Sequence, residues 1–301
     1  MFTITKYKVG NSLNLVVVST CIILLIVSLC KCKYFFRIIY TTKKTSLDTC
    51  FVKLFYSIFN VFNNCDIFIL VIFMKNYIKR ILKGITVILI FYFSTLFQYI
   101  PIILFKMDVN KMKGNYSLAV LLSVFSALCV SILIIIIYRK ELVNEFKKFK
   151  NNFSSCIDTG VACWILGLII MVVSNVVISY FFKAGGAKNE EAVQTLISAA
   201  PIYMALDVCL LAPFNEEMVF RKALRDITFN KYLFIFLSFL IFGGAHVIGS
   251  ATSIVDYLYI IPYGVLGGMF AYAYTKTDTI FTTITFHMIH NTALFLISIL
   301  L

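Results

Sequence analysis

Long apolar runs recur along the chain and are separated by short polar connections. About 20 apolar residues are what an α-helix needs to cross the hydrocarbon layer of a bilayer. The pattern therefore predicts an all-α fold, a polytopic bundle of about eight transmembrane helices, with about seven to nine as the range. The runs are residues 13–30, 52–74, 85–105, 117–138, 161–182, 194–214 (or on to 226), 232–250, 254–274 and 279–301.

The first two runs differ from the others in their surroundings. The run at 13–30 is followed by Lys31 and Lys33 rather than by a small-residue cleavage site. This favours a membrane helix that is kept in the mature protein over a signal peptide that is removed. The run at 52–74 is the weakest, because it contains a lysine, three asparagines and an aspartate. It lies either across the membrane or at its interface.

Basic residues in short connections mark the cytoplasmic side of a membrane protein. The connections at 139–150 and 221–231 are basic, whereas 183–193 balances two lysines against two glutamates. We therefore expect the chain to leave the cytoplasmic side after residue 150 and to return to it near residue 221. The N-terminal topology stays open, since the connections on both sides of the 52–74 run are basic.

The polar segment 139–160 divides the chain into two parts. Residues 1–150 are predicted to hold the N-terminal transmembrane helices and a basic cytoplasmic connection. Residues 151–301 contain most of the polar side chains that interrupt apolar runs, and we expect them to form a catalytic transmembrane core.

Composition agrees with a membrane location. The chain is 61% hydrophobic, and its mean hydropathy of +0.94 exceeds what one soluble core requires. The net charge is +13, but the basic residues are spread over the connections, which predicts anionic lipid headgroups rather than nucleic acid as partners. The nine cysteines are scattered without metal-ligand spacing and are interpreted as small buried hydrophobes.

Ionisable side chains at membrane depth are costly unless paired or hydrated, so each one is a hypothesis for a functional site. Glu217 and Arg221 are four residues apart in the run that follows Pro213, and can pair on one helix face. Glu216 is then left on another face. Two adjacent carboxylates repel each other where water is scarce, which should make one of them a proton acceptor. The alternative is a cytoplasmic helix end with ordinary surface charges.

All three histidines of the chain fall in two apolar runs. His246 follows Phe242 and three small residues, while His287, His290 and Asn291 lie within five residues of the last run. Each histidine alone is equally explained as a packing residue that bonds neighbouring helices. Their clustering favours a shared site, as chance would rarely place all three there. Asp207 lies in the run before Pro213, and its role is left open between support and structure.

These residues suit peptide hydrolysis, which needs a base for water, a proton carrier and donors for the oxyanion. A glutamate, two histidines and an asparagine supply these roles without a nucleophilic serine or cysteine. Glutamate and histidine also bind zinc, in which case Glu216, His246 and His287 would be the ligands. The motif HExxH is absent, so we expect no cofactor, with zinc as the alternative.

The polar residues resemble the CPBP intramembrane proteases, also called Abi or CAAX amino-terminal proteases, which include the type II CAAX prenyl endopeptidases. That family carries EExxxR, FxxxH and HxxxN on successive helices, and the segment from Gly264 to Thr277 resembles the helix before the last motif. The resemblance covers roughly residues 160–301. The residues that match its motifs are Glu216, Glu217, Arg221, Phe242, His246, His287 and Asn291.

The resemblance implies roles for these residues. Glu216 would activate water with the help of His246, while His287 and Asn291 would form the oxyanion site. Glu217 and Arg221 would support the first pair. His290 falls in a variable position of the motif and receives no role.

The substrate is expected to be a membrane-associated peptide or protein. The residue bias and the glycine-rich run at 254–274 are typical of bacterial members, so we expect a multi-pass protein of a bacterial cell membrane. By resemblance, its work would be peptide maturation or bacteriocin self-immunity rather than cleavage of prenylated tails. The alternatives are a non-catalytic scaffold or immunity protein that keeps the fold, and a transporter, which should show internal repeats.

Overall fold

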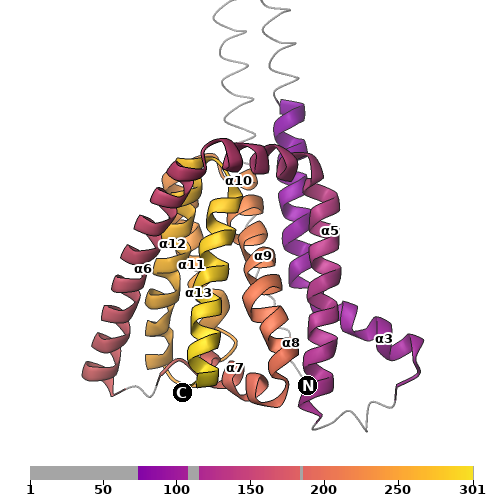
Figure 1. Cartoon of the computed structure of the whole chain (residues 1–301), viewed down its shortest axis with the longest axis vertical. Helices are drawn as coiled ribbons and strands as arrows, with labels where there is room; N and C mark the ends of the chain where they lie inside the picture. Colours follow the sequence, from indigo (N-terminus) through magenta and orange to yellow (C-terminus); the bar gives the residue numbers. More distant parts are fainter. Residues whose placement is uncertain (1–73, 108–114, 184–185, 301) are drawn as a thin grey trace, which may run out of the picture. The chain divides into compact units, whose positions relative to one another are not determined.

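The computed structural model describes residues 74–107, 115–183 and 186–300 (Figure 1). By its internal contacts the chain separates into Met1–Ile72 and Phe73–Leu301, and the description below concerns the second unit. Its elements are helical, which confirms the predicted all-α fold. The proposed division of the chain at residue 150 stays a prediction, and a single helix runs through that position.

The first helix of the described residues is Met74–Tyr92. The further elements, in order, are η1 (Ser94–Gln98), α3 (Tyr99–Leu104), α5 (Tyr116–Asn151), α6 (Phe153–Phe182), α7 (Lys188–Ala199), α8 (Pro201–Leu206), η2 (Asp207–Leu211), α9 (Ala212–Glu217), η3 (Met218–Ala223), α10 (Leu224–Ile227), α11 (Lys231–Val247), η4 (Val255–Tyr259), α12 (Ile260–Thr277) and α13 (Ile280–Leu300).

Three described helices are long and apolar enough to cross a membrane: α5 with 36 residues, α6 with 30 and α13 with 21. Met74–Tyr92 and Ser94–Leu104 would add a fourth span if they are taken together, with a bend of 54°. The predicted count of about eight spans is not tested by these helices. The run at 13–30 and nearly all of 52–74 lie outside the described residues.

Two predicted elements are wrong in their boundaries. The run at 194–214 is not one helix, because the chain breaks at Ala200 (φ −152°, ψ 65°) before Pro201, and a residue that precedes proline is disfavoured in the helical region. A second helix then continues without interruption to Ile227. The segment 139–160 is not a polar connection either. It is helical apart from the bend at Asn152, since its charged residues are good helix formers that water solvates at the end of a span.

The two basic segments meet at one end of the bundle. Lys222 donates to Glu145 at 2.7 Å, and the hydroxyl of Tyr138 donates to Asp226 at 3.0 Å. Glu145 also accepts from the backbone N–H of Ile280 at 2.8 Å. These bonds join the end of α5 to the end of the helix that finishes with α10 and to the start of α13 (Figure 1). Their common position agrees with the prediction that 139–150 and 221–231 face the same side.

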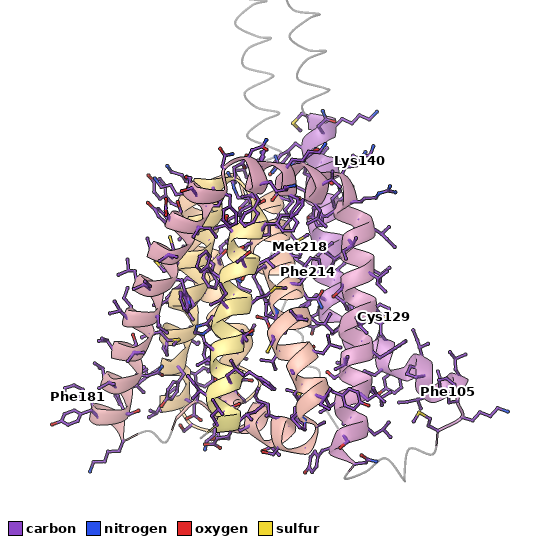
Figure 2. The ribbon with its side chains drawn as sticks, viewed as in Figure 1. Phe105, Cys129, Lys140, Phe181, Phe214 and Met218 are labelled. Carbon is purple, nitrogen blue, oxygen red and sulfur yellow. The ribbon has the colours of Figure 1, made fainter. Side chains whose placement is uncertain are left out.

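Glycines allow α11 and α12 to pack closely. A Cβ atom on Gly243 would lie 2.4 Å from the carbonyl oxygen of Ile260, and one on Gly264 would lie 2.8 Å from that of Phe239. Neither position has room for a side chain. The outer face of the bundle is apolar, as expected for contact with lipid: Phe181 on α6 points away from the other helices, whereas Met218 points among them (Figure 2).

Candidate active site

The two adjacent glutamates lie in an unusual helix. Between Pro201 and Ile227 the helix contains two π-helical segments, η2 and η3, which flank the short α9 that carries Glu216 and Glu217. Such segments are rare and are frequently found at functional sites. The ring of Pro213 would clash with the carbonyl of Cys209 in a regular α-helix, and Cys209 lies within η2.

Glu217 and Arg221 form the buried ion pair that their spacing predicted. Both side chains are 0% exposed, and Nη1 of Arg221 lies 3.2 Å from Oε1 of Glu217. The guanidinium also lies 4.4 Å from the ring centre of Phe242, a cation–π distance. Glu217 thus forms an ion pair with a residue one turn further along its own helix. Arg221 also packs against Phe242 of α11.

His287 lies between the two glutamates. Its Nδ1 is 2.8 Å from Oε1 of Glu217, and its Nε2 is 3.7 Å from Oε2 of Glu216. A carboxylate only accepts, so Nδ1 carries the proton of this hydrogen bond. In the neutral imidazole, the lone pair of Nε2 then faces Glu216.

His246 approaches Glu216 from α11. Its Nδ1 lies 2.9 Å from the carbonyl oxygen of Phe242, which can only accept, so Nδ1 is the donor. The other nitrogen, Nε2, lies 4.0 Å from Oε2 of Glu216. The ring of Tyr263 is stacked on the imidazole with 4.8 Å between centroids, and its hydroxyl donates to Glu190 at 2.8 Å.

The depths of the two histidines along their helices differ, yet both reach one carboxyl oxygen. His246 is fifteen residues after the start of α11, and His287 is seven residues after the start of α13. The side chain of His246 turns back toward the start of its helix, as its bond to Phe242 shows. Phe242 in turn packs against His287, with 5.8 Å between ring centroids.

Three acceptor atoms therefore face one another: Oε2 of Glu216 and the Nε2 atoms of His246 and His287. Oε2 of Glu216 is buried and has no hydrogen-bond partner among the described residues. A water molecule, which offers two O–H donors and a nucleophilic oxygen, complements such a set.

The donor types of this set also suit zinc, which binds carboxylate oxygen and imidazole nitrogen at about 2.0–2.2 Å. Within residues 74–107, 115–183 and 186–300, however, no three His, Cys, Asp or Glu side chains are arranged to hold a metal ion. The predicted zinc ligands Glu216, His246 and His287 do not fit the metal in this conformation. Zinc dependence stays a prediction.

The polar residues of the site fall in a stretch that matches a known family. The family model described as "Type II CAAX prenyl endopeptidase Rce1-like" matches residues 198–293. This segment is similar to the Rce1-like family. It contains the complete set of Glu216, Glu217, Arg221, His246, His287 and Asn291. The resemblance found in the motifs is thereby confirmed.

Two bacterial relatives extend the match beyond the Rce1-like segment. "Putative membrane peptidase YdiL" of Bacillus subtilis (strain 168) is 26% identical over 175 residues, which are 57% of this chain and 67% of that protein. An "Uncharacterized protein" of Mycoplasma capricolum subsp. capricolum is 29% identical over 164 residues. That match takes in 49% of this chain and 47% of the Mycoplasma protein, so about half of the relative's length is covered. No solved structure matches the chain.

Asn291 lies one turn beyond His287 in the Rce1-like segment but bonds to the backbone. Its Nδ2 donates to the carbonyl oxygen of Val208 at 3.0 Å, and Val208 belongs to η2. An amide nitrogen has two hydrogens, so one remains for another acceptor. Asn291 therefore anchors the π-helical segment while it keeps a second donor.

His290 and Asp207 stand apart from this set. Nε1 of Trp164 donates to Nδ1 of His290 at 3.3 Å, so His290 bonds α13 to α6 and fits the packing role considered from the sequence. Asp207 begins η2 and makes no hydrogen bond or ion pair within the part of the chain that the structure describes. Its role stays open.

Sequence reasoning missed three side chains that hold the site or the helices around it. Tyr263 covers His246, and Trp164 holds His290. Ser131 donates to Oδ1 of Asn215 at 2.9 Å, which fixes α5 beside the residue that precedes Glu216. Aromatic and hydroxyl side chains are common in membrane helices, so these residues carried no signal in the sequence.

Proposed function

We propose that this protein is an intramembrane peptidase in which Glu216 and His246 activate a water molecule for attack on a peptide bond. The Rce1-like match and the membrane-peptidase name of the Bacillus relative support a membrane protease. The observation that carries the finer proposal is the convergence of Glu216, His246 and His287 on one point, with acceptor atoms facing inward.

In the proposed reaction, Oε2 of Glu216 takes a proton from water as the water oxygen forms a bond to the carbonyl carbon of the substrate. His246 orients the water through Nε2, because its Nδ1 is held by the carbonyl of Phe242. The proton then passes to the leaving amine as the carbon–nitrogen bond breaks. The products are a carboxylic acid and an amine, so one water is consumed and no other reactant is needed.

The oxyanion of the intermediate needs donors. Asn291 supplies the amide hydrogen that is not used on Val208. His287 donates through Nε2 when both of its nitrogens carry a proton, and Glu217 is its countercharge in that state. The pair formed by Glu217 and Arg221 keeps the imidazole in place.

The proposed substrate is a membrane-associated peptide or protein of a bacterial cell membrane, cleaved in peptide maturation or in bacteriocin self-immunity. The lipid-facing apolar surface of α6 and α13 supports a substrate that is delivered within the bilayer. Anionic lipid headgroups are the second proposed partner, in keeping with the net charge of +13.

The deciding experiment is cleavage of a mixture of synthetic apolar transmembrane peptides by the purified full chain, followed by mass spectrometry. We expect the natural protein to cleave and the variants Glu216→Ala and His246→Ala to lose turnover while they still express. Asp158→Asn is the control, since it removes an exposed carboxylate of α6 outside the site. Equal cleavage by all four proteins would overturn the mechanism, and no cleavage by any of them would favour the scaffold.

A chelator in the same assay separates the water mechanism from its zinc-dependent version. The proposed mechanism predicts unchanged cleavage after chelation. Loss of activity that returns on addition of zinc would replace it by the metal-dependent reaction.

A further inference from the structure

A basic cavity lies between the helix Met74–Tyr92 and α5, and neither Glu216 nor Glu217 lines it. Its volume is about 420 Å³. Six of its lining residues are charged, and five of these are basic. The six charged residues are Lys79, Arg80, Lys83, Arg139, Lys140 and Glu141.

The basic charge of this cavity is only partly balanced. Glu141 pairs with Lys83, and Arg80 pairs with Asp226 at 3.1 Å. Lys79, Arg139 and Lys140 make no ion pair within residues 74–107, 115–183 and 186–300. Two helices thus present unbalanced positive charges to a shared space, where a bound anion would lower their repulsion.

The cavity also has an apolar side. Ile136 and Ile137 of α5 line it, and Ile136 is 65% exposed. Only Tyr138 separates these residues from Arg139, so the cavity lies where the apolar part of a candidate membrane span gives way to its basic end, near Lys140 (Figure 2). A ligand with an anionic head and an apolar tail matches both sides.

We infer that this cavity binds the phosphate headgroup of an anionic phospholipid. Lys79 and Arg139, from the two helices, contact the phosphate, and Ile136 contacts the first part of an acyl chain. The basic groups stand in a pocket between helices at the expected cytoplasmic side, which is the usual setting for recognition of an anionic headgroup.

The cavity is linked to the helix that carries Glu216. Arg80 of its lining bonds to Asp226, and Asp226 also accepts from Tyr138 of α5. Asp226 belongs to α10, the last part of the continuous helix that begins at Pro201. A lipid bound beside Arg80 would therefore hold the end of this helix against α5 and stabilise the fold.

The test uses the full chain, purified in an uncharged detergent and depleted of lipid. Its thermal unfolding midpoint is followed during titration with short-chain phosphatidylglycerol, short-chain phosphatidylcholine or inorganic phosphate. The double variant Lys79→Gln, Arg139→Gln removes one basic residue from each side of the cavity. The matched control Lys147→Gln, Lys150→Gln removes two exposed basic residues of α5 outside it.

We expect phosphatidylglycerol to raise the midpoint of the natural protein and of the control at low concentration. The cavity variant should need about 30-fold more of this lipid, as expected for two basic contacts. The single variant Lys140→Gln, which removes an exposed side chain, should shift the titration in the same direction if the double variant folds poorly.

Three results would overturn the inference. Equal titrations of the cavity variant and the control would show an effect of general surface charge. An equal effect of phosphatidylcholine would show that anionic charge is not recognised. A full effect of inorganic phosphate would show a site for free phosphate rather than for a lipid.

Discussion

Nδ1 of His287 lies 2.8 Å from Oε1 of Glu217, and the same oxygen lies 3.2 Å from the guanidinium of Arg221. One carboxylate oxygen therefore holds a residue of α13 and a residue of its own helix together. The neighbouring Glu216 makes no such bond. Two adjacent glutamates are thus expected to respond very differently to the same substitution.

Glu217→Gln should reduce stability strongly. It leaves the fully buried Arg221 without its countercharge, and breaking a buried ion pair in this way costs about 3–5 kcal/mol. Thermal unfolding in detergent measures the loss. The double variant Glu217→Gln, Arg221→Gln should recover part of it, and an unchanged unfolding midpoint in the single variant would contradict the assigned pairing.

Glu216→Gln should leave the unfolding midpoint nearly unchanged, because the side chain has no hydrogen-bond partner to lose at Oε2. Turnover should fall by about 10²–10⁴-fold, the usual contribution of a general base. Cleavage and unfolding are measured on the same preparation. A large loss of stability with little loss of turnover would assign Glu216 to structure instead.

Asn291→Ala should lower kcat by about 10²–10³-fold with little change in KM, as expected for the loss of an oxyanion donor. The bond to the carbonyl of Val208 is lost as well, which should cost about 1 kcal/mol of stability. Asn291→Asp tests the donor directly, since it keeps the size but has no amide hydrogen. Normal kcat in both variants would remove Asn291 from the reaction.

Tyr263 is expected to position His246. Tyr263→Ala removes the stacked ring, whose contact is worth about 0.5–1.5 kcal/mol, so kcat should fall by about 2- to 10-fold. Tyr263→Phe keeps the ring and loses only the bond to Glu190, and should retain most of the activity. Equal losses in the two variants would show that the hydroxyl, rather than the stacking, is what matters.

Gly243→Ala should destabilise the bundle, because its Cβ would lie 2.4 Å from the backbone oxygen of Ile260. Helices α11 and α12 must then separate, at a cost of about 1–3 kcal/mol. Gly249→Ala is the control, since a Cβ there meets nothing within 4 Å. Identical unfolding midpoints for the two variants would refute the close packing at Gly243.

The sequence was sufficient to predict the all-α fold and the polar residues that the structure gathers around Glu216. Long apolar runs set the fold class, and the cost of burying Glu217 and Arg221 made their pairing nearly unavoidable. Their spacing of four residues then placed both on one face, even though the helix departs from the α form at Met218.

The boundaries and the supporting contacts were less predictable. A break at Ala200 depends on one residue before a proline, which a hydrophobic pattern does not register. The bond from Asn291 to Val208 depends on a backbone carbonyl, and the two π-helical segments have no recognised residue signature. The stacking of Tyr263 on His246 is a contact between separate helices that only packing determines.

The π-helical segments make the site sensitive to chain length as well as to residue type. A π-helical segment bonds residues five apart and an α-helix bonds residues four apart, so the deletion of one residue from Asp207–Leu211 would convert this segment to the α form and shift its carbonyl groups. The carbonyl of Val208 would then leave Asn291, even though every polar residue of the three motifs would still be present. Transplanting EExxxR, FxxxH and HxxxN onto three regular helices should therefore not transfer the site. The π-helical backbone also determines where the side chains of these motifs lie.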